Sequence, residues 1–328
     1  MATVSLALRG RGEVARDRAA HVRAIAEEMG YRPNPLLAAL ASKRFSNSKD
    51  LQGTPIAIFE FPALPGTPAS RVSPYRTFLM EEARKLGYSP SHHLFPGKES
   101  PATLFHQLYS RSAQGLIVTG SVDMEEFGKA FDWRPFSVVQ CARYRAEYPF
   151  HTVRPNIFQS IKQAFTTLRK RGYKRIGFAL GRHEILLEDD EDRHGTAFAL
   201  EQAYLPKKDR LPVYLGAIED KKAFLHWFHA HRPDAVVGFR VGQYWYLRDE
   251  GIRIPEQVGF ASLHLSEKDT EIAGFHQNAE EIARQSIQML DQFIRNRQRG
   301  PATHPMHLLI PSRWQEGRTL HPELENGN

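Results

Sequence analysis

The chain has 328 residues, of which 41% are hydrophobic, a formal net charge of +7 and a single cysteine, Cys141. One cysteine excludes an internal disulfide framework and a zinc site built from several cysteines. No apolar run approaches the length of about 18 residues that a membrane-spanning helix needs. The N-terminus also lacks the apolar segment and small-residue cleavage site of a secretory signal, so we expect a cytoplasmic protein.

The first fifty residues differ in kind from the rest. They hold nine basic and five acidic residues, a net charge of +4 that is more than half of the total. Apolar spacing predicts helices over 2–9 and 17–29, and Asn34 and Pro35 suit the start of a short helix that ends near Ser42. A basic helical arm favours a polyanionic partner, although a solvated basic helix face has the same pattern.

From residue 55 onward, strand patterns alternate with helix patterns. Short apolar runs predict strands at 55–61, 115–120, 136–142, 175–181, 213–217, 234–239 and 258–263. Helical patterns occupy 74–86, 101–109, 157–171, 193–204, 221–231, 242–250 and 280–297. This alternation is typical of doubly wound α/β folds. The region is longer than one sheet usually needs, so we expect two Rossmann-like lobes.

Several segments resemble one known family. The stretches "ATVSLALRG" and "VRAIAEEMGYRPNPLLAAL" resemble the DNA-binding headpiece and hinge helix of the lactose/galactose repressor (LacI/GalR) family. Downstream, "LRKRGYKRIGFALG", "RPDAVVGF" and "LRDEGIRIPEQVGFASL" resemble its effector-binding region in the same order. The implied fold is α/β, with two Rossmann-like lobes of the type I periplasmic-binding-protein kind. An incomplete, all-α helix-turn-helix headpiece and a hinge helix precede them.

The resemblance implies the following domain organisation. Residues 1–45 form the headpiece and hinge helix, residues 46–54 a linker, and residues 55–328 the effector-binding and dimerisation domain. We expect the first lobe to comprise 55–153 and 279–305, and the second lobe 154–276 and 306–328. The three crossovers between them are expected near 151–156, 272–278 and 307–312.

The family match also nominates DNA-binding residues. A helix-turn-helix reads base edges from the start of its second helix, and Met1, Ala2 and Leu6 fall at such positions. Thr3 and Ser5 match positions whose hydroxyls hold phosphates. In the hinge helix, Leu40 matches a leucine that wedges into the minor groove, flanked by Asn34 and Lys43. An exposed amphipathic linker helix is the alternative for this segment.

The start of the chain bears on this assignment. Family headpieces carry a first helix and turn before the point at which this match begins. A lone recognition helix buries too little apolar surface to stay docked. We therefore expect the chain as written to bind operator weakly or not at all, while still binding effector and dimerising. The alternative function is a headpiece-defective module that binds a small molecule without operator DNA.

Effector-binding candidates follow from the rule that open α/β sheets bind ligands beyond the carboxyl ends of their strands. Asn156 and His264 stand where the family often has aspartate, and Arg240 replaces a common asparagine. Fewer carboxylates and more cations would suit an acidic ligand better than the neutral sugar that the family usually binds. For each residue, an ordinary rim polar group is the alternative. The full set is Phe61, Tyr75, Gln140, Asn156, Arg193, Arg240 and His264.

Patterns of catalytic chemistry are lacking in the sequence. It contains neither the G-x-x-x-x-G-K-[ST] phosphate loop nor the G-x-S-x-G nucleophile motif. His226 and His229 share a helix face without an evident third ligand, and the acidic run 188–192 is expected to be a solvated loop. We therefore expect a non-enzymatic, homodimeric transcription regulator, most simply a repressor, that responds to a carbohydrate effector. We expect no metal and no cofactor.

Overall fold

The computed structural model describes residues 16–28, 53–61, 73–95, 99–120, 124–142, 149–183 and 188–323. The chain separates into two units, residues 1–53 and 54–328. In the first unit the described element is helix α2 (Arg16–Glu28), close to the helix predicted over 17–29. The predicted DNA-binding residues lie outside the described residues: Met1, Ala2, Thr3, Ser5, Leu6, Asn34, Leu40 and Lys43.

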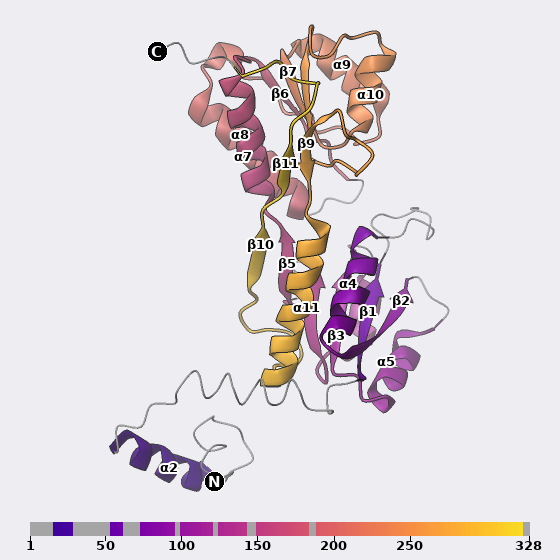
Figure 1. Ribbon diagram of the computed structural model, residues 1–328, viewed down its shortest axis with the longest axis vertical. Coiled ribbons are helices and arrows are strands. Elements are labelled where there is room, and N and C mark those ends of the chain that lie inside the picture. The colour runs from indigo at the N-terminus through magenta and orange to yellow at the C-terminus, as the bar shows by residue number, and fades with distance from the viewer. Residues whose placement is uncertain are drawn as a thin grey trace. The chain divides into compact units, whose positions relative to one another are not determined.

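The second unit contains two α/β lobes, each built on its own sheet (Figure 1). The sheet of lobe 1 has six strands in the order β10-β5-β4-β3-β1-β2, and every neighbouring pair is parallel. Its strands are β1 (Thr54–Glu60), β2 (Tyr88–Leu94), β3 (Gly115–Thr119), β4 (Ser137–Cys141), β5 (His151–Pro155) and β10 (His307–Ile310).

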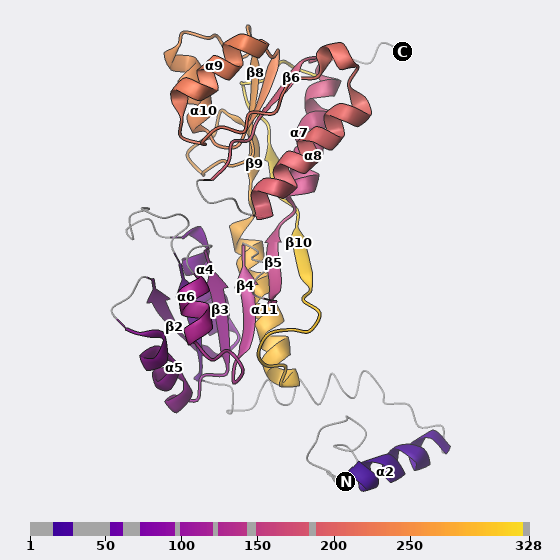
Figure 2. The same ribbon diagram turned by 180° about the vertical axis from the view of Figure 1, so that it is seen from behind.

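Helices cover both faces of the lobe 1 sheet (Figures 1 and 2). Helices α4 (Pro74–Lys85) and α11 (Ala279–Asn296) lie on one face, and α5 (Pro101–Ser110) and α6 (Met124–Ala130) on the other. A serine precedes proline at the start of both α4 and α5, and its hydroxyl caps the helix by accepting a backbone N–H. Proline at the first helical position lacks only an N–H that would be unpaired there, so the pattern fixes both helix starts.

Lobe 2 is a five-stranded sheet in the order β11-β9-β8-β7-β6, parallel except for β11. Its strands are β6 (Ile176–Ala179), β7 (Ala235–Gly238), β8 (Gly259–Ser262), β9 (Ala273–His276) and β11 (Arg313–Gln315). Helices α7 (Ile157–Lys170) and α8 (Glu188–Tyr204) cover one face, and α9 (Lys221–His231) and α10 (Gly242–Asp249) the other (Figure 1). A short 3-10 helix, η1 (Lys207–Asp209), follows α8.

The chain crosses between the sheets at three described points: from β5 into α7, from β9 into α11, and from β10 into β11. The two lobes are therefore woven from non-contiguous segments. Strands β3, β4, β6, β7, β8 and β9 are buried along their whole length, as expected for parallel strands covered on both faces. The predicted fold class, two Rossmann-like α/β lobes, is confirmed for this unit.

Several local elements differ from the prediction, and strands β5, β9, β10 and β11 and helix α6 were not predicted. Residues 213–217 form one isolated bridge, Arg182–Ala217, instead of a strand, since the segment turns away after a few bonds to the chain beyond β6. Strand β2 was missed because "YSPSHHL" is polar and contains Pro90, which only an edge strand tolerates. The acidic run 188–192 is the first turn of α8 rather than a solvated loop.

Among the described residues, no helix combines the length and apolar character needed to cross a membrane. The apolar helix faces are instead packed onto the sheets. On α11, for example, Ile282, Ile287, Leu290 and Phe293 are buried, and this helix contacts β3 and β4.

Gly120 gives a test of this packing. It follows β3 with a φ of +85°, and a Cβ there would lie 2.0 Å from the carbonyl oxygen of Phe61. Gly120→Ala should therefore lower the free energy of unfolding by about 2–4 kcal/mol, through backbone strain plus a clash. Gly53 has the same φ of +85° but open space around it, so Gly53→Ala should cost only about 1–2 kcal/mol. Equal losses in chemical denaturation of the two variants would contradict this packing.

Candidate functional site

The strands of lobe 2 bring polar and aromatic residues to one edge of the sheet. Strands β6, β7 and β8 are parallel neighbours, so their carboxyl ends meet at the same edge. His183 lies shortly after β6, Phe239 directly after β7, and His264 two residues after β8. These side chains converge because the register of the sheet places their strand ends side by side.

Phe239 is the centre of this group, with only 3% of its surface exposed. The guanidinium carbon of Arg193 lies 3.9 Å from the centre of its ring, and that of Arg240 lies 5.5 Å away. The rings of His264 and His183 approach it edge-on, with centroids at 4.6 Å and 5.6 Å. Cations and aromatic edges are attracted to such a ring by its quadrupole. We call these residues, with Asp190, the Phe239 cluster.

Asp190 fixes Arg193 over the ring. Its carboxylate is fully buried and forms an ion pair with Arg193, one helical turn further along α8. The same carboxylate accepts a hydrogen bond from His183 Nδ1 at 2.8 Å and one from the His183 backbone N–H at 3.3 Å. A buried carboxylate is stable only with such partners, so Asp190 holds α8 and the segment after β6 together.

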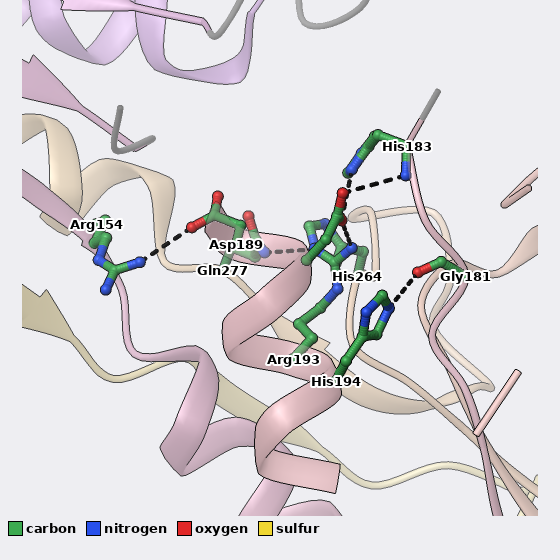
Figure 3. A network of polar contacts seen from close by, with 9 residues as sticks. Arg154, Gly181, His183, Asp189, Arg193, His194, His264 and Gln277 are labelled. Atoms are coloured by element: carbon green, nitrogen blue, oxygen red, sulfur yellow. Dashed lines mark hydrogen bonds and ion pairs between the residues drawn. The ribbon is translucent and has the colours of Figure 1, made fainter. Parts of the chain in front are cut away.

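His194 adds a second tie between the same two segments. Its Nε2 donates to the carbonyl oxygen of Gly181 at 2.7 Å (Figure 3). Burial lowers the pKa of His194, and the positive charge of Arg193 lowers it further, against an increase from the hydrogen bond. The uncharged ring is therefore favoured at neutral pH, and it still has the one N–H that this contact needs.

A polar chain links the cluster to lobe 1. The hydroxyl of Tyr75, on α4, donates to Gln277 Oε1 at 3.4 Å. The amide of Gln277 in turn donates to His264 Nε2 at 2.7 Å (Figure 3). Gln277 directly follows β9 and precedes α11, so it lies on one of the crossovers. His264 in lobe 2 is thus connected through Gln277 to Tyr75 in lobe 1.

Four of the seven predicted effector residues belong to this arrangement: Arg193, Arg240 and His264 contact Phe239, and Tyr75 is joined through Gln277. The other three have different partners. Phe61 stacks on Phe95, 4.5 Å away in the lobe 1 core, and Gln140 accepts a hydrogen bond from Thr152 inside the sheet. Asn156 caps α7 by accepting the backbone N–H of Gln159 at 3.0 Å.

The charges of the cluster are balanced. Arg193 is paired with Asp190, and Arg240 Nη1 lies 3.2 Å from a carboxylate oxygen of Glu219. These pairs offset part of the excess of cations that the sequence indicated, and the preference for an acidic ligand stays a prediction. Two neutralised arginines and polar neutral groups suit an uncharged ligand better.

Sequence reasoning missed Phe239, Asp190, His183 and Gln277. Asp190 was read as part of a solvated acidic run, yet its spacing of three from Arg193 is the signal for an ion pair on one helix face. Phe239 was predicted to end a buried strand, and the next residue, Arg240, was chosen as the effector residue instead. His183 and Gln277 lie in segments that follow strands, and no spacing in the sequence relates them to Asp190 and to Tyr75.

Lobe 1 carries a separate surface groove of about 270 Å³ between α4 and β2. His92 on its wall lies 2.7 Å from Glu60, a buried carboxylate that also accepts the backbone N–H of Ser73. The groove is lined by Arg76, Thr77, Met80, Glu81, Arg84 and His92. Within the described part of the chain, no group of His, Cys, Asp or Glu residues is arranged to hold a metal ion.

Comparisons with known proteins agree with this architecture. Residues 165–320 match the family described as a periplasmic binding protein-like domain. The chain is 24% identical over 275 residues to catabolite control protein A of Staphylococcus epidermidis, covering 80% of this chain and 78% of that protein. In sequence, this chain is therefore similar to a periplasmic binding protein-like domain and to catabolite control protein A.

Solved structures show the shared fold over nearly the full length. The lac repressor dimer bound to operator and an anti-inducer is 15% identical, with a TM-score of 0.60 and coverage of 98% of this chain and 95% of that one. The transcriptional regulator CelR in complex with cellobiose is 17% identical, with a TM-score of 0.60 and coverage of 97% and 95%. At these identities the two structures show that the fold is shared.

The Phe239 cluster predicts a stability difference between two phenylalanines. Phe239→Leu removes a buried ring and its contacts with Arg193 and two histidines, and should lower the free energy of unfolding by about 2–3 kcal/mol. Phe198, on α8, is 61% exposed, so Phe198→Leu should change it by no more than about 0.5 kcal/mol. Denaturant titration followed by far-ultraviolet circular dichroism would measure both. A loss for Phe239→Leu as small as that for Phe198→Leu would contradict the central place of the ring.

Proposed function

We propose that this protein is a DNA-binding transcriptional regulator, acting as a repressor, whose operator affinity is set by a small-molecule effector bound between the two lobes. We propose further that it acts as a homodimer in the cytoplasm and that the effector is a sugar or sugar derivative. The observation that carries the proposal is the Phe239 cluster, which sits at a ligand-binding edge of the sheet and connects through Gln277 to lobe 1.

The chemistry of the cluster suits a polyhydroxylated, uncharged ligand. Arg193 is 2% exposed, and its guanidinium is a planar array of N–H donors whose charge is balanced by Asp190. His264, Gln277 and Tyr75 add groups that can donate or accept hydrogen bonds. Phe239 supplies an apolar wall next to them. A few convergent polar groups beside an aromatic surface are typical of small-molecule sites.

Regulation requires that the effector favour one arrangement of the lobes over another. An effector changes DNA affinity only through a difference in its own affinity for the two arrangements. A ligand that bonds to His264 or Gln277 would compete with the chain from Tyr75 to His264, and so would bias the crossover between β9 and α11. Relatives support this interpretation by their names: one is an operator-bound repressor dimer and one a cellobiose-bound regulator.

A panel of sugars tests the effector class. Thermal unfolding of the full chain would be followed with glucose, cellobiose, gluconate and glucose 6-phosphate, because a ligand that binds only the folded state raises the Tm. We expect a neutral sugar to raise it. Arg193→Lys should weaken that binding at least about tenfold, since lysine keeps the charge but loses the planar fork. Arg171→Lys is the matched control, because Arg171 pairs with Glu316 at the far end of α7.

The same protein preparation tests the proposed binding to DNA. Fragments selected from genomic DNA should bind the chain as written only weakly, with an affinity that falls steeply with salt, as phosphate contacts require, and the neutral sugar should change that affinity. Stabilisation by gluconate and glucose 6-phosphate alone would contradict the effector class. Sugar binding without any salt-dependent DNA binding would instead support the alternative of a ligand-binding module.

A further inference from the structure

Arg154 occupies a position between the lobes that the effector site does not explain. It lies on β5, the strand at which the chain leaves lobe 1, and its side chain is 15% exposed. Its Nη1 donates to Asp189 Oδ1 at 3.1 Å (Figure 3). The same Nη1 donates to Asp192 Oδ2 at 2.8 Å. Both carboxylates belong to the first turn of α8, in lobe 2. We call these three residues the Arg154 clamp.

Residues at the start of α8 make contacts on two different faces of the helix. Asp189 and Asp192 are three residues apart and share the face toward Arg154. Asp190 and Arg193 have the same spacing and share the face toward Phe239. Because one helical turn is a rigid unit, a movement of Arg193 over Phe239 moves the carboxylates that hold Arg154.

The other end of the clamp is fixed in the sheet of lobe 1. Strand β5 pairs with β4 on one side and with β10 on the other, where Arg154 is in register with Leu309. His307, on β10, lies close enough that Arg154 lowers its pKa and Asp192 raises it, although burial is the larger cause of the lowered value. The clamp therefore joins lobe 2 to two of the three crossover segments.

Burial makes this contact stronger than an ordinary surface pair. Arg154 and Asp189 are mostly shielded from water, and one guanidinium serves two carboxylates. In contrast, Lys221 and Asp249, which join α9 to α10 within lobe 2, are 39% and 60% exposed. Exposed pairs of that kind contribute little to stability or geometry, because water and salt screen them.

We propose that Arg154 is a positioning residue that, through Asp189 and Asp192, sets the arrangement of the two lobes and transmits occupancy at Arg193 to the crossover strands. The proposal rests on the proposed function only for the statement that a ligand binds at Arg193. The clamp itself acts without any bound ligand.

The test measures the distance between the lobes directly. Cysteines introduced as Arg111→Cys in lobe 1 and Glu250→Cys in lobe 2, both at exposed positions, would carry spin labels, while Cys141 is buried and stays unlabelled. Double electron–electron resonance then gives the distance distribution without ligand. Arg154→Gln should move its maximum by more than about 2 Å or broaden it, a change in lobe arrangement. Lys221→Gln, the matched control, should leave the distribution unchanged.

A second set of variants separates positioning from a general structural role. Asp189→Asn with Asp192→Asn should reproduce the distribution of Arg154→Gln, and combining all three changes should add nothing. Arg154→Lys should restore part of the wild-type distribution, because it keeps the charge. Near-ultraviolet circular dichroism of each variant would verify that it is folded.

A folded Arg154→Gln variant with the wild-type distance distribution would overturn the proposal. So would carboxamide variants whose effect adds to that of Arg154→Gln. Since no sugar or DNA enters this experiment, its failure is distinct from a failure of the effector panel. If the clamp is confirmed, adding the stabilising neutral sugar should shift the wild-type distribution but should shift that of Arg154→Gln less.

Discussion

The buried carboxylate of Asp190 is the constraint on which the rest of the site depends. A fully buried carboxylate is costly unless it is paired and hydrogen-bonded, and Asp190 is satisfied by Arg193 and by both polar groups of His183. Meeting that requirement ties α8 to the segment after β6 and fixes the guanidinium of Arg193 above Phe239. The register of the sheet places Phe239 and His264, and the ion pair then fixes Arg193 and His183 beside them.

The same helical turn explains how a local site can have a distant effect. The face toward Phe239 carries Arg193, and the face toward Arg154 carries the carboxylates that hold that residue on a strand of the other lobe. A second link runs from His264 through Gln277 to Tyr75. The second link starts at His264, which contacts Phe239. The first starts at Asp189 and Asp192, which are adjacent in sequence to Asp190 and Arg193 of the Phe239 cluster. Coupling between sites requires such shared elements with more than one arrangement, and the crossovers are the natural ones.

Much of the fold could be predicted from the sequence, because buried parallel strands are short apolar runs and the helices between them are periodic. Helix α9 begins and ends where it was predicted, at Lys221 and His231. Strand β2 was missed because an edge strand needs only one good face. The site was predicted less completely. Arg193, Arg240 and His264 follow from strand ends and family positions. Asp190, by contrast, sits in a run whose composition indicates solvation, and only the tertiary contacts with His183 and Arg193 bury it.

A double-mutant cycle on Asp190 and Arg193 tests the central claim most directly. The free energy of unfolding would be measured for Asp190→Asn, Arg193→Gln and the double variant. Each single change removes the ion-pair partner of a buried charge and should cost about 3–5 kcal/mol. The double variant removes both charges, so its loss should fall short of the sum of the single losses by at least about 2 kcal/mol. Losses that add to within about 0.5 kcal/mol would show that the two residues act independently, and would contradict the account.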